Sequence, residues 1–188
     1  FYSLIQFGYK ASSGTGMMLI ITLYAIVTII SIFGGYLPKF FVEKKGMHPY
    51  SGRMLSMLIF AFFPLFALFA QPMGQFSAWW PAIIIGLAGA GHQAWSANLF
   101  STVGDMFPKS AIATITGIGG MAGGISSFLI NWISGYLFDY ADKTQMQFLG
   151  FEGKPAGYFI IFCYCAVAYL LGWMVLKAFV PKYKAVQG

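Results

Sequence analysis

Long stretches without a charged side chain are the feature that most constrains this chain. Residues 11–38, 54–104, 110–138 and 155–176 contain no Asp, Glu, Lys or Arg. Only 9% of the 188 residues are charged, whereas 59% are apolar. Because so few ionisable groups cannot cover the surface of a soluble protein of this length, we expect a chain that lies in a lipid bilayer.

The apolar runs set the number of expected spans. A helix needs about 20 predominantly apolar residues to cross the hydrocarbon layer. The run 54–104 is long enough for two crossings, and the segment Gln71–Gln75, which contains Pro72 and Gly74, predicts a turn between them. We therefore predict an all-α membrane protein with five transmembrane helices, near residues 16–38, 54–70, 77–103, 111–138 and 157–178.

Basic residues are distributed unevenly over the two sets of alternating loops. One set holds eight of them: Lys39, Lys44, Lys45, Arg53, Lys109, Lys177, Lys182 and Lys184. The other set holds only Lys10, Lys143 and Lys154. Because short loops rich in Lys and Arg stay on the cytoplasmic side, we predict a cytoplasmic C-terminus for this multi-pass protein. The net charge of +6 then reflects a one-sided basic collar, and we expect no nucleic-acid partner.

The odd number of spans bears on how the sequence begins. Residue 1 is Phe, and the segment Phe1–Tyr9 is too short and too polar to be a complete crossing. Five spans with a cytoplasmic C-terminus place residue 1 outside, so we expect that a sixth, preceding span is missing. Six-span halves are the building unit of one large class of secondary transporters.

Two stretches of sequence carry a resemblance to a known family: "GHQAWSANLFSTVGDMFPKSAIATITGIGGMAGG" and, further on, "GFEGKPAGYFIIF". They are similar to the C-terminal half of bacterial hexuronate transporters, members of the anion:cation symporter family within the major facilitator superfamily. The likeness runs from about Ser12 to Lys184. The segment "GGYLPKFFVEKKGMHPYSGR" only loosely resembles the basic cytoplasmic loop of the superfamily, because Lys39 stands near the position of its usual Asp. We therefore assign no gating salt bridge to this loop.

The resemblance implies both a fold and a function. The chain, residues 1–188, resembles most of a six-helix C-terminal bundle whose N-terminal half is missing. The function implied is proton-coupled import of hexuronates such as glucuronate or galacturonate, by alternating access, across the bacterial inner membrane. The implied partners are the sugar acid, a co-transported proton, the lipid bilayer and the N-terminal half bundle.

Independently of the resemblance, the third expected span carries polar groups at its middle. His92, Gln93 and Ser96 share one helical face, whereas Trp95 and Asn98 lie on a neighbouring face. Polar groups at this depth are costly unless they face a bundle interior or a water-filled cavity. We predict that His92, Gln93 and Ser96 line the substrate path, with Trp95 and Asn98 at its edge or bridging to an adjacent helix.

Two further lining candidates lie on other spans. Tyr24 belongs to the first expected span and Ser127 to the fourth. For both, and for Ser96 and Asn98, the alternative is a hydrogen bond between helices with no ligand role. For His92 the alternative is a structural histidine with satisfied hydrogen bonds.

Small residues mark the third and fourth spans. The stretches "GLAGAG" at 86–91 and "GIGGMAGG" at 117–124 contain small residues at four-residue spacing, including Gly119 with Gly123 and Gly120 with Gly124. Such spacing lets helix backbones approach closely, and it also permits bending. We expect packing to be the main role.

Catalytic and metal-binding patterns are missing from the sequence. The five carboxylates, Glu43, Asp105, Asp139, Asp142 and Glu152, all fall in loops or at span ends, so no paired acids lie in the membrane. Cys163 and Cys165 point to different faces of one helix and indicate packing thiols. We therefore expect no enzyme, no metal and no cofactor. Two alternatives stay open: the same scaffold with another organic anion, such as an aldonate, an amino-sugar acid or an aromatic acid, and a membrane-embedded enzyme or structural subunit.

Overall fold

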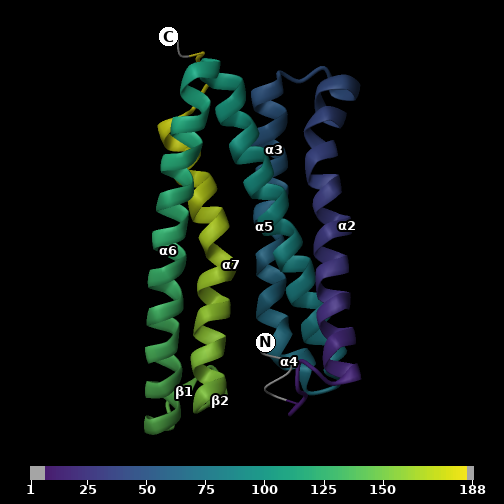
Figure 1. Ribbon diagram of the computed structural model, residues 1–188, viewed down its shortest axis with the longest axis vertical. Coiled ribbons are helices and arrows are strands. Elements are labelled where there is room, and N and C mark those ends of the chain that lie inside the picture. Colours follow the sequence, from purple (N-terminus) through teal and green to yellow (C-terminus); the bar gives the residue numbers. More distant parts are fainter. Residues whose placement is uncertain (1–6, 186–188) are drawn as a thin grey trace. The chain divides into compact units, whose positions relative to one another are not determined.

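The protein is almost entirely helical. A computed structural model describes residues 7–185. In chain order its elements are α2 (Gly14–Lys45), α3 (Pro49–Ala61), the 3-10 helix η1 (Phe63–Phe69), α4 (Ala70–Gly74), α5 (Trp79–Met106), α6 (Lys109–Thr144), β1 (Gln147–Phe148), β2 (Phe151–Glu152) and α7 (Lys154–Phe179), as Figure 1 shows. The expected all-α class is confirmed, with one short β-hairpin added. The expectation of a span before residue 1 lies outside the described residues.

Four helical segments of the described chain are long and apolar enough to cross a membrane. They are Gly14–Lys45, Pro49–Gly74, Lys109–Thr144 and Lys154–Phe179. These segments make the chain a multi-pass membrane protein. The third expected span, near residues 77–103, coincides with α5, which is 28 residues long but is not among these four segments. It is less apolar, because it carries His92, Gln93 and Asn98. The count of five spans thus remains a prediction.

The chain divides into two compact units. The first contains the residues up to Thr102 together with Cys165–Tyr183, and the second contains Val103–Tyr164. Within the first unit, α2, α3 and the larger part of α5 lie side by side (Figure 1). The C-terminal part of α7 packs on them, and the Trp173 indole donates a hydrogen bond to the Met54 carbonyl at 2.8 Å. The expected six-helix bundle stays a prediction.

The first helix extends beyond its expected end at Pro38. Pro38 lies inside α2, which continues to Lys45. A proline interrupts one backbone hydrogen bond without ending a long helix. The helix ends instead at Gly46, whose φ of 64° is left-handed. The Gly46 N–H donates to the Val42 carbonyl, and the Met47 N–H donates to the Phe41 carbonyl. The last turns of α2 thus carry basic residues of the collar, including Lys44 and Lys45.

The expected turn at Gln71–Gln75 is wrong in its position. Residues 70–74 form α4, and the connection to α5 follows at residues 75–78. Pro72 stands in the first turn of α4, where a backbone N–H has no partner within the helix, so the proline is tolerated there. The chain turns only after Gly74, and that glycine keeps a negative φ within α4.

The second unit has a two-residue hairpin that joins α6 to α7. Strands β1 and β2 pair antiparallel with Phe148 opposite Phe151. Leu149 and Gly150 between them both have positive φ, 46° and 85°, as a tight hairpin turn requires. The Phe151 ring packs against Phe159 at 4.8 Å between centroids, which fixes the hairpin on the start of α7.

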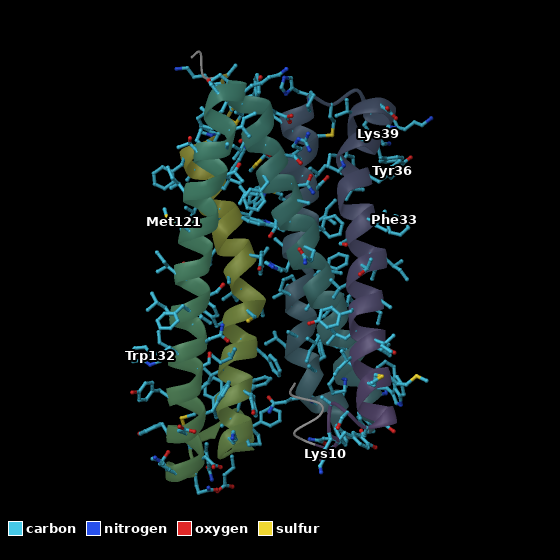
Figure 2. The ribbon with its side chains drawn as sticks, viewed as in Figure 1. Lys10, Phe33, Tyr36, Lys39, Met121 and Trp132 are labelled. Carbon is cyan, nitrogen blue, oxygen red and sulfur yellow. The ribbon has the colours of Figure 1, made fainter. Side chains whose placement is uncertain are left out.

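Large apolar side chains point outward from the helices of both units (Figure 2). On α2, Phe33 and Tyr36 are 60% and 55% exposed. On α6, Met121 and Trp132 are 65% and 56% exposed. A soluble surface rarely carries contiguous patches of this kind, whereas a lipid-facing surface consists of them.

Candidate functional site

The predicted site residues on α5 divide between a packed face and an open one. Ala90, Ala94 and Asn98 are buried within the first unit. His92 and Gln93 are exposed, while Trp95 and Ser96 are half-buried between the two faces. His92 lies almost midway between the ends of α5, Trp79 and Met106. The structure thus places the predicted lining residues at the middle of the helix, on the side that does not pack on α2.

Asn98 makes a hydrogen bond between helices. Its side chain is 2% exposed, and Nδ2 donates to the Gly34 carbonyl of α2 at 2.9 Å and to the Ala94 carbonyl of its own helix at 2.8 Å. A Cβ added to Gly34 would lie 2.2 Å from the Ala94 Cβ, so the two backbones are in close contact here. Asn98 therefore bridges α5 to α2, the structural one of the two roles expected for it.

His92 contacts a residue that the sequence did not single out. Its Nδ1 shares a hydrogen bond with the Tyr169 hydroxyl of α7, and the two rings meet edge to face with centroids 5.6 Å apart. Both residues belong to the first unit. Tyr169 lies in a uniformly apolar stretch, where periodicity gives no sign of which residue meets His92. Only the pairing of α5 with α7 reveals it.

Trp95 completes a cluster of three rings. It packs edge to face on Tyr169, with centroids 5.6 Å apart and an interplanar angle of 76°. Gly172, one turn further along α7, leaves room for the indole, because a Cβ there would lie 3.8 Å from the Trp95 ring. His92, Trp95 and Tyr169 form what we call the midspan cluster.

The indole N–H of Trp95 has no hydrogen-bond partner. The Nε1 atom is buried, and no acceptor lies within reach among the described residues. An unsatisfied buried donor costs about 1–3 kcal/mol, so it is favourable for such a group to meet an acceptor. The midspan cluster therefore contains a donor that would gain a hydrogen bond from a carboxylate, a hydroxyl or water.

The two candidates on other helices lie apart from this cluster. Contacts of α2 with Gly86 of α5 come from Leu23 and Ile26, whereas Tyr24 is 64% exposed. Ser127 belongs to the second unit and is exposed, and its carbonyl accepts a hydrogen bond from the Asn131 side chain at 2.8 Å. The role of either residue in a substrate path stays a prediction.

The two glycine stretches differ in what surrounds them. A Cβ at Gly91 would lie 2.4 Å from the Phe63 Cβ, and one at Gly86 would lie 3.1 Å from the Leu23 carbonyl oxygen. The stretch 86–91 therefore serves close packing, as expected. At the glycines of 117–124 nothing lies within 4 Å of an added Cβ, so this part of α6 presents an open backbone surface in the second unit.

Over residues 7–185, no three His, Cys, Asp or Glu side chains gather in a way that could hold a metal ion. The polar groups of the midspan cluster can donate, accept and exchange protons, but no carboxylate lies among them. Such an arrangement suits the binding of a polar molecule.

Comparison with known proteins adds no relative: no family model, no curated protein and no solved structure matches this chain.

Proposed function

We propose that this chain is the C-terminal half of a proton-coupled hexuronate importer of the bacterial inner membrane, working by alternating access. One observation carries the proposal furthest: the midspan cluster holds a buried indole N–H without a hydrogen-bond partner among the described residues, at the middle of a helix that also exposes Gln93 and has no charged residue until Asp105. Polar groups placed so deep are typical of a substrate path.

The proposed roles follow from the chemistry of each group. Gln93 offers two donors and one acceptor, which suits the hydroxyls and the carboxylate of a sugar acid. The Trp95 N–H donates to an acceptor oxygen of the substrate, and the indole ring covers its apolar face. His92, bonded to Tyr169, can take up or release a proton. Ser96 stands beside them, half-buried.

The charge that balances the substrate must come from elsewhere. An uncompensated anion in the hydrocarbon layer is strongly disfavoured. The helices of this chain offer only His92 at that depth, so the N-terminal half must supply the Arg or Lys that pairs with the anion and the acids that carry the proton. Under this proposal the chain alone is not expected to transport.

The basic collar supports the proposed orientation. In the first unit, Lys39, Lys44, Lys45 and Arg53 lie at the end of the α2–α3 pair opposite to Lys10, and Lys10 and Lys39 stand at opposite ends of the unit in Figure 2. The end with more basic residues faces the cytoplasm.

Uptake into proteoliposomes tests the function. The full-length protein that contains this chain is reconstituted, and radiolabelled glucuronate and galacturonate are offered with and without an inward proton gradient. Accumulation that a protonophore abolishes is the expected result. If a folded protein takes up neither acid but does take up an aldonate, the scaffold carries another organic anion, and the hexuronate assignment is wrong.

A substitution of Gln93 tests whether the uptake depends on the polar residues of α5. Gln93→Ala should lower uptake about five- to thirtyfold, because one or two hydrogen bonds to the substrate are lost at about 1 kcal/mol each. Gln75→Ala, in the exposed connection before α5, is the matched control and should transport normally. Equal uptake by the two variants, at equal abundance in the membrane, would remove Gln93 from the substrate path.

A further inference from the structure

A groove opens between α2 and α3 at the basic end of the first unit. Its volume is about 290 Å³, near the lower limit of ordinary ligand pockets at about 300 Å³. Lys39, Val42 and Glu43 of α2 line one side, and Pro49 and Arg53 of α3 line the other. Both helices belong to the same compact unit, so the groove lies within that unit.

Close packing below the groove explains its shape. Gly52 of α3 lies against α2, where an added Cβ would come within 3.2 Å of the Pro38 carbonyl oxygen and 3.5 Å of a Val42 methyl group. Helix α3 begins at Pro49 after only three residues of connection, Gly46–His48, so the end of α2 and the start of α3 stay close to each other. The space left between them is walled by Pro38, Val42 and Pro49 and edged by charged side chains.

The charges at the groove favour an anion. Lys39 and Arg53 contribute two positive charges, and Glu43 contributes one negative charge. The Lys39–Glu43 pair is 3.8 Å long, and both side chains are more than half exposed. Such a surface pair contributes about 0–1 kcal/mol, so Lys39 can turn to a better anionic partner at little cost. Arg53 supplies the planar, two-pronged donor that fits a phosphate group.

The position of the groove in the bilayer limits what can enter it. Residues 11–38 and 54–104 carry no charge, and the groove lies where these apolar runs end. It therefore opens at the level of the lipid headgroups, with Lys44 and Lys45 exposed on the neighbouring turn of α2. Basic pockets between transmembrane helices on the cytoplasmic side are suited to phosphorylated headgroups.

We propose that the α2–α3 groove binds the phosphate of an anionic phospholipid. Arg53 and Lys39 hold the phosphate oxygens, while Pro38, Val42 and Pro49 contact the apolar part of the lipid next to the headgroup. This site is separate from the midspan cluster and does not depend on the proposed transport activity.

Lipid-dependent thermal stability measures this binding without any transport assay. The full-length protein in detergent is titrated with phosphatidylglycerol, with phosphatidylcholine and with inorganic phosphate, and the unfolding temperature is followed. We expect phosphatidylglycerol to raise that temperature, and the other two to raise it much less.

Single charge-removing variants locate the site. Lys39→Gln and Arg53→Gln should each weaken phosphatidylglycerol binding about fivefold, whereas Lys10→Gln, at the opposite end of α2, should leave it unchanged. The Lys39 side chain is 61% exposed, so its substitution leaves the fold intact even if that of Arg53 does not. Equal binding by Lys39→Gln and Lys10→Gln would overturn the proposal. Protection by inorganic phosphate as strong as that by phosphatidylglycerol would replace the lipid with a soluble anion.

Discussion

At the scale of single residues, the polar groups of α5 have different roles although they lie within two turns of one another. The buried side chain of Asn98 has a structural role, because its amide donates a hydrogen bond that joins α5 to α2. His92 and Trp95 are instead tied to α7 through Tyr169, and they leave one buried donor unused. This contrast separates groups that hold the helices together from groups that are available to a ligand.

The hydroxyl of Tyr169 can be removed without disturbing its ring. Tyr169→Phe should lower hexuronate uptake about fivefold and change its pH dependence, because the His92 ring loses its hydrogen-bond partner. Tyr164→Phe on the same helix, where the side chain is 49% exposed, serves as the control. The measurement is initial uptake across a series of pH values. An unchanged rate and pH profile would assign Tyr169 to packing alone.

The role of Asn98 predicts a loss of stability. Asn98→Ala removes a buried hydrogen bond to Gly34 and leaves that carbonyl less well satisfied, so unfolding should become easier by about 1–3 kcal/mol. Asn131→Ala removes an exposed hydrogen bond within one helix and should change stability little. Thermal unfolding of the two variants in detergent compares them directly. Equal unfolding temperatures would show that the bridge to α2 contributes nothing.

At the scale of helices, close contact at glycine decides how α5 packs. Gly91→Ala would press a methyl group against Phe63 and the Phe60 carbonyl, at 2.4 and 2.9 Å, and should destabilise the protein by about 1–3 kcal/mol. Gly104→Ala, on the same helix with nothing within 4 Å, should be neutral or slightly stabilising, since alanine favours the helix. The unfolding temperatures of the two variants test this difference. A Gly91→Ala protein as stable as the Gly104→Ala protein would contradict the packing described here.

The helices were largely predictable from the sequence, because uncharged runs must span the hydrocarbon and must be helical there. Their ends were less predictable. The sequence predicts a span end at Pro38 and a turn around Pro72, but Pro38 lies inside α2 and Pro72 in the first turn of α4. What ends α2 is the left-handed Gly46, in a loop where hydrophobic pattern carries no information.

The candidate site was predictable only in part. His92, Gln93 and Ser96 stand out because they are polar in an apolar run. Tyr169 does not stand out, because aromatic residues are common in such apolar helices. Its role depends on which helix it faces, and the sequence does not give that. The helical periodicity places Asn98 on a neighbouring face and allows it to bridge to another helix, but only the structure shows that this helix is α2.

At the scale of the whole molecule, the basic collar predicts which ends of the helices face the cytoplasm, and cysteine labelling can test this membrane topology. Single cysteines are placed by Lys45→Cys and Lys143→Cys, in a background in which Cys163 and Cys165 are replaced by alanine. A membrane-impermeant maleimide applied to intact cells should label the cysteine at 143 and not the one at 45 if the collar end faces the cytoplasm, as we propose. Labelling of both positions only after cell lysis, or of position 45 alone, would contradict the orientation.

The proposed function is symport, in which a sugar acid and a proton cross the membrane together. Proton movement that a sugar acid drives into proteoliposomes is the strictest test of this symport. Proteoliposomes of the full-length protein are filled with a pH-sensitive dye, prepared without a pH gradient, and given glucuronate on the outside. We expect the lumen to acidify when glucuronate is added, and we expect glucose to have no such effect. Gln93→Ala should greatly reduce the change in luminal pH. Entry of labelled glucuronate with no change in luminal pH would contradict proton coupling.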